Sequence, residues 1–139
     1  MKPFIVAFSV STLVQLYKFF SFWITHRRPS FPRLFQTGGM PSSHSAAVAA
    51  LTTTVYLEQG ARAPLFGVTL FFSLIVMYDA AGVRRAAGRQ AWILNRLLEE
   101  HENKELRERR LLELLGHTPF EVLVGAALGV AVALVWDAV

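Results

Sequence analysis

The sequence Gly38-Gly39-Met40-Pro41-Ser42-Ser43-His44-Ser45 leads directly into an apolar, uncharged run over residues 46–57. Glycines and small polar residues before a helix let the backbone turn and leave the first N–H groups of the helix open to a ligand. Because the helix dipole also favours negative charge at this end, such a helix start is typical of a phosphate site. The imidazole of His44 can in addition move protons near neutral pH. The stretch therefore predicts a helix with a phosphate-handling site at its beginning.

Four nearly uncharged segments organise the chain around this stretch. They are residues 4–24, 45–57, 64–78 and 122–136. Because 53% of the 139 residues are hydrophobic and 17% are charged, the charge is concentrated in the connections. Only the first segment reaches the roughly 20 residues that cross a bilayer, so we expect the others to be short, tilted spans. We predict an all-α, single-domain membrane bundle over residues 1–139, with about four spans plus a polar surface helix, and keep a soluble bundle of apolar helices as the alternative.

The charges between the segments indicate sidedness and partners. The connection of residues 25–41 is basic, and the long connection of residues 79–118 carries most of the remaining charge. With four spans both connections lie on one side, and their basic residues favour the cytoplasmic side, although arginines retained for chemistry would give the same bias. The net charge of +4 suits phosphate and lipid head groups, and we expect no nucleic acid partner. The absence of cysteine excludes disulfides and thiolate chemistry.

The connection of residues 79–118 contains a helical pattern of its own. Alanines and leucines at helical spacing over residues 86–98 predict a helix, and two favourable i,i+4 ion pairs follow it, Glu100–Lys104 and Glu105–Arg109. We interpret this helix as a polar arm on the membrane surface, a connector with a partly buried face. A lid over the site is the functional alternative.

A second cluster, Gly116-His117-Thr118-Pro119-Phe120-Glu121, opens the last apolar segment. If the helix includes His117, then Glu121 shares its face at i,i+4 and can hold the imidazole in one tautomer. In the competing interpretation Thr118 is the N-cap, Pro119 is the first helical residue and Glu121 completes a capping box. In that case His117 lies just outside the helix. Both can hold, because a carboxylate has lone pairs for two partners.

The two clusters belong at the same membrane face, because one begins the second span and the other begins the fourth. Two positive helix ends and the imidazoles of His44 and His117 can therefore converge on one anion. In the last span, Gly125 and Gly129 continue a stripe of small residues that lets another helix pack closely.

Basic residues complete the candidate site. Arg84 and Arg85 follow the third span on the same side, and arginine is the residue type that binds phosphate oxygens bidentately. Asp79 can orient one of them, although either arginine can instead anchor the helix to lipid phosphates. Lys18 ends a polar stripe in the first span, and a polar stripe inside a membrane helix is typical of a functional face. Alternatively, the long Lys18 side chain can reach the membrane surface.

The strings Gly-Gly-Met-Pro-Ser-Ser-His-Ser, Asp-Ala-Ala-Gly-Val-Arg-Arg and Gly-His-Thr-Pro-Phe-Glu, in this order, resemble a small divergent branch of the type 2 phosphatidic acid phosphatase superfamily. This superfamily is related to the vanadium-dependent haloperoxidases. The resemblance implies hydrolysis of a membrane lipid phosphate, such as phosphatidate or a polyprenyl phosphate, through a phosphohistidine and without a metal or cofactor. It implies that His117 is the nucleophile, that His44 is the general acid and that Glu121 holds His117. Ser42 and the amide of Ser43 would bind phosphate oxygens.

The sequence departs from the superfamily pattern at two of these positions, with Ser43 in place of glycine and Glu121 in place of aspartate. These departures leave two alternatives open, a non-catalytic binder or carrier of lipid phosphate and a purely structural bundle. A vanadate-dependent halide oxidation would be unusual for a small membrane-embedded chain. The expected partners are the lipid phosphate substrate and membrane lipids. The sequence does not name the lipid, and it leaves open whether a homo-oligomer forms.

The basic positions of the superfamily pattern are also altered. Lys18 and Arg28 stand farther apart than the lysine and arginine of its Lys…Arg-Pro element. At least one of the two residues therefore does not correspond clearly to that element. No Ser-Arg pair lies just before His117, and we expect Arg84 or Arg85 to supply that charge from another element.

Overall fold

The computed structural model describes residues 1–27, 39–99 and 116–139, without the side chains of residues 83–85. These residues form helices and no strand, which confirms the predicted all-α fold. The helices are α1 (Lys2–His26), α2 (Ser43–Gln59), α3 (Pro64–Ala81), α4 (Val83–Glu99) and α6 (Pro119–Ala138).

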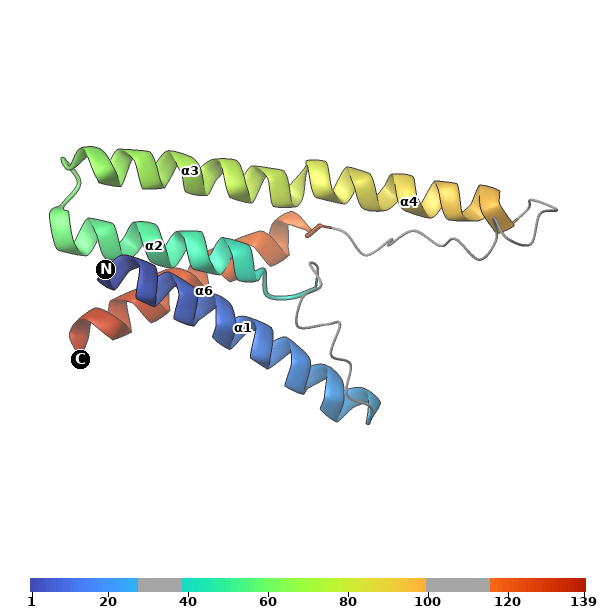
Figure 1. Cartoon of the computed structure of the whole chain (residues 1–139), viewed down its shortest axis with the longest axis horizontal. Helices are drawn as coiled ribbons and strands as arrows, with labels where there is room; N and C mark the ends of the chain where they lie inside the picture. The colour runs from blue at the N-terminus through green and yellow to red at the C-terminus, as the bar shows by residue number, and fades with distance from the viewer. Residues whose placement is uncertain (28–38, 100–115) are drawn as a thin grey trace.

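The helices α1, α2, α3 and α6 pack side by side, with α2 in contact with each of the other three (Figure 1). The end of α1, the start of α2, the end of α3 and the start of α6 all lie at one end of this bundle, which we call the site end. Both termini lie at the opposite end, where Lys2 Nζ is 2.7 Å from Asp137 Oδ1. The starts of α2 and α6 therefore share one end of the bundle, as the alternation of the apolar segments predicts.

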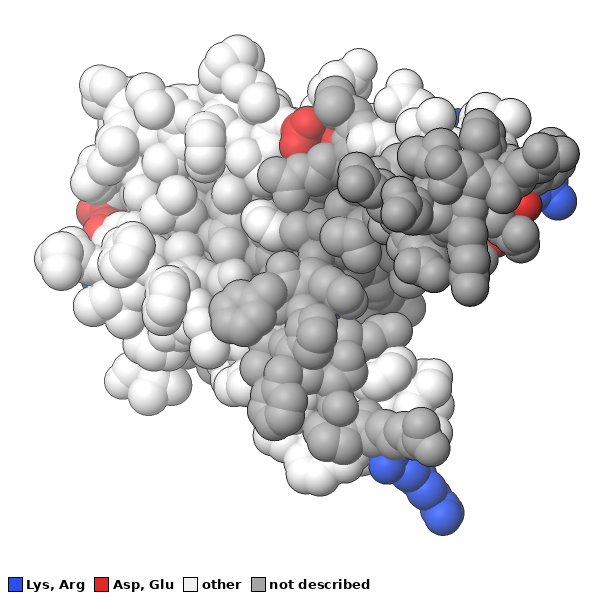
Figure 2. All heavy atoms as spheres, turned by 45° about the vertical axis from the view of Figure 1, so that its right-hand side comes forward, with Lys and Arg blue, Asp and Glu red and all other residues white. Residues whose placement is uncertain are grey.

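Three stretches of the described chain are long and apolar enough to cross a membrane. They are Lys2–His26, Pro64–Glu99 and Pro119–Ala138. Large apolar side chains are exposed along all three, and few Lys, Arg, Asp or Glu atoms appear on the part of the bundle that Figure 2 does not draw in grey. An aqueous protein rarely exposes apolar surface on this scale, whereas lipid tails accommodate it. The chain is an integral membrane protein with several spans.

The apolar segment of residues 45–57 predicts the second membrane span, and the helix found there, α2, is too short to qualify as one by length. It has 17 residues, and much of its surface is buried by α1, α3 and α6. Serine, threonine and alanine supply most of this buried surface, because short side chains let the neighbouring helices approach closely. By length and composition three of the helical stretches qualify as spans, and α2, which runs between the same two ends of the bundle, is a shorter central helix.

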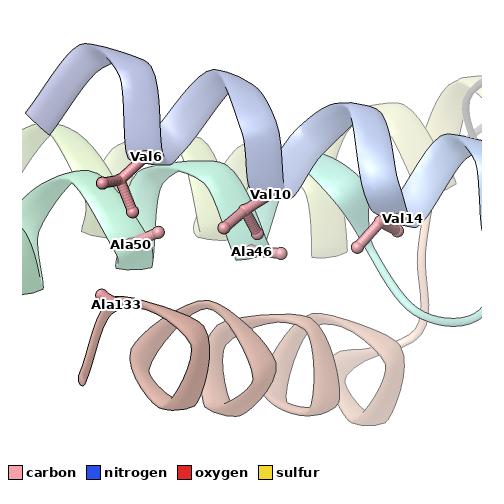
Figure 3. Close-up of a cluster of buried hydrophobic side chains, with 6 residues drawn as sticks. All are labelled: Val6, Val10, Val14, Ala46, Ala50 and Ala133. Carbon is pink, nitrogen blue, oxygen red and sulfur yellow. The ribbon is translucent and has the colours of Figure 1, made fainter. Parts of the chain in front are cut away.

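The core lies where α1 meets α2 and α6. Its buried residues are Val6, Val10, Val14, Ala46, Ala50 and Ala133. Figure 3 shows Val6 and Val10 of α1 opposite Ala50 and Ala46 of α2, with Val14 on the same face of α1. Four-residue spacing places the valines on one face of α1, and the short alanines opposite leave room for their branched side chains.

The predicted stripe of small residues in α6 is confirmed as the contact with α2. A Cβ atom at Gly125 would overlap the carbonyl oxygen of Ser42, and one at Gly129 would overlap that of Ala46. Only glycine lets the two backbones lie this close. The stripe therefore fixes the position of α6 against the start of α2.

The helix predicted over residues 86–98 is present as α4. It follows α3 after Gly82 and extends in nearly the same direction beyond the bundle (Figure 1). Within α4, the guanidinium of Arg96 lies 4.8 Å from the centre of the Trp92 ring. The described chain shows no turn of α4 across the end of the bundle, so its position on the membrane surface stays a prediction. The pairs Glu100–Lys104 and Glu105–Arg109 lie outside the described residues.

Candidate functional site

The candidate site lies where the starts of α2 and α6 meet. The backbone N–H of Ser42 donates to the carbonyl oxygen of Glu121 over 3.2 Å. Since Ser42 is the N-cap of α2 and Glu121 lies in the first turn of α6, this bond joins the two helix starts directly. Both starts direct their positive dipole ends to the same region. The predicted convergence of the two sequence clusters is therefore present.

The start of α2 is held by a serine pair. Ser42 Oγ accepts from the backbone N–H of Ser45 over 3.3 Å and from Ser45 Oγ over 2.9 Å. Both serines are fully buried, so the Ser42 hydroxyl serves as a helix cap. Ser45, whose part in this cap was not predicted, could have been found from its position three residues after the N-cap. Gly39, at φ 73°, makes the turn that leads into the helix.

Ser43 and His44 occupy the first turn of α2 beside this cap. Ser43 is buried, whereas the His44 side chain is exposed at the site end. The N–H groups of a first turn have no partner within their helix, so these residues can offer backbone donors to an anion. The role of the Ser43 amide and of the Ser42 hydroxyl in binding phosphate stays a prediction.

The start of α6 forms the capping box that the sequence predicts. The N–H of Glu121 donates to Thr118 Oγ1 over 3.3 Å, and the N–H of Thr118 donates to Glu121 Oε2 over 2.9 Å. His117 therefore lies just outside the helix. Its backbone N–H donates to the carbonyl oxygen of Ala80 over 3.0 Å, which ties the residue to the end of α3. Gly116, at φ 87°, allows the chain to enter this turn.

The His117 side chain is buried beside Glu121, so both interpretations of Glu121 hold together. Its Nδ1 atom lies 3.4 Å from Glu121 Oε2, and only 2% of the imidazole is exposed against 22% of the carboxylate. This distance exceeds that of a usual N–H···O hydrogen bond, about 2.7–3.2 Å. Among the described residues, neither ring nitrogen of His117 has a hydrogen-bond partner. A buried imidazole without such a partner is suited to meeting a ligand.

Burial and three neighbouring side chains set the pKa of the His117 ring. Burial lowers the pKa of His117 below its usual 6.5, and the nearby Lys18 ammonium and the His44 imidazole lower it as well. The Glu121 carboxylate acts in the opposite direction. Burial has the largest effect, so His117 is neutral at pH 7, as a nucleophilic imidazole must be.

The structure brings six of the predicted site residues to one place. Lys18, half-buried in α1, interacts electrostatically with both His117 and Glu121, and His44 interacts with His117. Ser42 and Ser43 join them through the contact between the two helix starts. These six residues come from α1, α2 and the start of α6, which the bundle holds together at the site end.

The remaining predicted residues are placed only in part. Asp79 lies half-buried in the last turn of α3, next to Ala80, whose carbonyl oxygen holds His117. Arg84 and Arg85 lie in the first turn of α4, directly after the end of α3. Their side chains, and the whole of Arg28, lie outside the described part of the chain. Their binding of phosphate stays a prediction.

The lowered pKa of His117 predicts an acid-sensitive fold. The folded protein holds His117 neutral while the unfolded chain takes up a proton at the usual pKa of 6.5, so acid favours unfolding. We expect the melting temperature in detergent to fall between about pH 7.5 and pH 5.5, and to fall less in His117→Gln. Differential scanning fluorimetry measures this difference. Equal pH dependence in the two proteins would contradict the buried, neutral state of His117.

Comparison with known proteins identifies two relationships. Residues 1–132 match a family described as the divergent PAP2 family. The chain is also 39% identical over 145 aligned residues to YuiD of Bacillus subtilis (strain 168), which is described as an uncharacterised membrane protein. This match covers 96% of the chain and 92% of the relative. No solved structure matches the chain significantly.

Proposed function

The chain belongs to the divergent PAP2 family, and we propose from this premise that it is a membrane phosphatase that hydrolyses a lipid phosphate through a phosphohistidine on His117. The observation that carries the proposal is the buried, neutral imidazole of His117 at the meeting point of two helix starts. This arrangement combines a nucleophile with the positive ends of two helices, which is what the transfer of a phosphoryl group requires.

In the first proposed step, His117 attacks the phosphorus atom in line with the bond to the lipid oxygen. Because Nδ1 faces Glu121, the carboxylate favours the tautomer with the proton on Nδ1 and leaves the Nε2 lone pair free to attack. The Nε2–P bond forms while the P–O bond breaks. His44 donates a proton to the departing oxygen, so the lipid leaves as an alcohol.

In the second proposed step, water releases the phosphoryl group. His44, now deprotonated, takes a proton from the water as its oxygen attacks the phosphorus atom. The P–N bond breaks, inorganic phosphate leaves, and His117 returns to its neutral form. Glu121 stabilises the positive charge that the His117 ring carries while it is phosphorylated.

Positive groups at the site end would bind the phosphoryl oxygens in both steps. Lys18 is a described cation that acts on His117, and we assign the same role to the predicted arginines Arg28, Arg84 and Arg85. We propose that Asp79 orients one of these arginines. Because the site lies at one end of the spans, the head group of phosphatidate or a polyprenyl phosphate would meet it at the membrane surface. From the basic connections we propose that this surface faces the cytoplasm.

Phosphate release by the purified protein tests the proposed activity. We expect the wild type in detergent to release phosphate from lipid phosphates. We expect His44→Ala to lower the rate by roughly 10²–10³-fold with an alkyl leaving group, because general acid catalysis is lost. A lipid-linked aryl phosphate with an acidic leaving group needs no such proton, so the loss should be much smaller with this substrate. An equal loss on both substrates would contradict the role of His44 as the acid.

A lipid phosphate carrier without catalytic activity is the second candidate. It is favoured by the Ser42 hydroxyl, which the cap of α2 uses, and by the bulkier Ser43 in place of glycine. The cap fixes the orientation of the Ser42 hydroxyl, and the Ser43 side chain fills space that glycine would leave open to a phosphoryl group. A wild type that is stabilised against unfolding by lipid phosphates and releases no phosphate would favour the carrier over the phosphatase.

A further inference from the structure

An apolar groove runs along the outside of the bundle between α1 and α6. It encloses about 460 Å³. Leu13 and Tyr17 of α1 form one wall, and Val124 and Leu128 of α6 form the other. Apart from the hydroxyl of Tyr17, the side chains that line the groove are entirely apolar. The groove lies on membrane-spanning helices, so hydrocarbon must fill it in the bilayer.

The groove leads to the candidate site. At the site end it is bounded by Met40 and Pro41, and Pro41 directly precedes Ser42, whose N–H bonds to Glu121. On the other wall, Val124 lies three residues after Glu121, which is less than one helical turn of about 5.4 Å. A chain attached to a phosphate at His117 could therefore pass this boundary directly into the groove.

The dimensions of the groove suit a single hydrocarbon chain. Its volume falls within the range of ligand sites, about 300–1,000 Å³. Bilayer tails are as apolar as these walls, so moving a hydrocarbon chain from the bilayer into the groove gains little free energy. The groove therefore acts by orienting the chain.

From this continuity, we propose that the α1–α6 groove holds one hydrocarbon chain of the lipid phosphate and aligns its phosphate with His117. The proposal rests on the proposed function and adds a selection by chain length. A long chain fills the groove and positions the phosphate, whereas a short chain leaves the groove to other lipids and gains no alignment. A second copy of this protein would need a broad matching face, whereas the groove is narrow and ends at the site.

Filling the groove with a larger side chain tests this proposal kinetically. We expect Leu128→Trp to lower kcat/KM for hexadecyl phosphate by about 10-fold and to leave that for hexyl phosphate within about twofold of the wild type. Leu123→Trp is the matched control, because Leu123 is an exposed residue of the same helix that does not line the groove. It should behave as the wild type with both substrates. Equal effects of Leu128→Trp on the two substrates, or no effect on either, would overturn the groove assignment.

Photolabelling tests the groove without relying on hydrolysis. A hexadecyl phosphate with a diazirine in mid-chain should label peptides that contain Leu13, Tyr17 and Leu128, and excess unlabelled hexadecyl phosphate should prevent this. Labelling spread evenly over the apolar face of α3, or cross-links between two copies at Leu128, would overturn the proposal. If the wild type is labelled in the groove and releases no phosphate, the proposed phosphatase activity is contradicted and the groove assignment stands. If hexadecyl phosphate is hydrolysed and the groove is not labelled, the groove assignment is contradicted and the phosphatase activity stands.

Discussion

Replacing His117 with glutamine should abolish phosphate release, with a loss of roughly 10⁴-fold or more. The amide of glutamine keeps a polar group in the buried position beside Glu121, but it cannot attack phosphorus. Neither of the other described histidines replaces the nucleophile in the proposed mechanism, because His44 is assigned to proton transfer and His26 lies exposed in the last turn of α1. The measurement is the release of inorganic phosphate from lipid phosphate by the purified variant in detergent.

His26→Gln is the matched control for this substitution. His26 is exposed and stacks on Phe22 within its own helix, so its replacement should leave the rate within about twofold of the wild type. Thermal unfolding of both variants shows whether either has lost its fold. A folded His117→Gln protein that releases phosphate at the wild-type rate would contradict His117 as the nucleophile.

Placing a methyl group at Gly129 should destabilise the protein and misplace the site. In Gly129→Ala the new Cβ atom would overlap the carbonyl oxygen of Ala46, which is backbone and cannot rotate away. The helix α6 must then move from α2, at a cost of about 1–3 kcal/mol. Because α6 carries Glu121 and adjoins His117, the shift should also reduce phosphate release by roughly 10²-fold. Thermal unfolding and the rate of phosphate release measure the two effects.

Gly67→Ala provides the matched control within α3. A Cβ atom at Gly67 would meet no other atom within 4 Å. Since alanine favours a helix over glycine by roughly 1 kcal/mol, this variant should be as stable as the wild type or slightly more so. If Gly129→Ala were equally stable and active, the close contact between α2 and α6 would not hold the site together.

The local part of the fold could be predicted from the sequence. The helix starts at Ser42 and Thr118 are set by caps within a few residues, and the apolar segments indicate where helices run. The central place of α2 and the continuation of α3 into α4 could not be predicted in this way. They depend on contacts between segments distant in sequence, such as Gly129 against Ala46, and local patterns do not contain these contacts.

The candidate site, too, has features that the sequence predicts and features that it does not. The closeness of His117 and Glu121 in sequence predicts their contact although His117 lies outside the helix, and the approach of His44 follows from the alternating direction of the helices. The use of the Ser42 hydroxyl as a buried cap, and the bond from its N–H to Glu121, depend on how closely α2 and α6 pack. Sequence spacing could not show this distance, so it could not separate the capping role of Ser42 from phosphate binding.

The proposed mechanism requires a covalent phosphohistidine on His117, and trapping it is the most direct measurement. Wild-type protein is mixed with a radiolabelled lipid phosphate, quenched within milliseconds in alkali, where a P–N bond survives, and mapped by peptide mass spectrometry. The mechanism predicts phosphate on the peptide that contains His117, formed before free phosphate appears and absent in His117→Gln. Phosphate release without a labelled His117, or a label on His44 in its place, would contradict it.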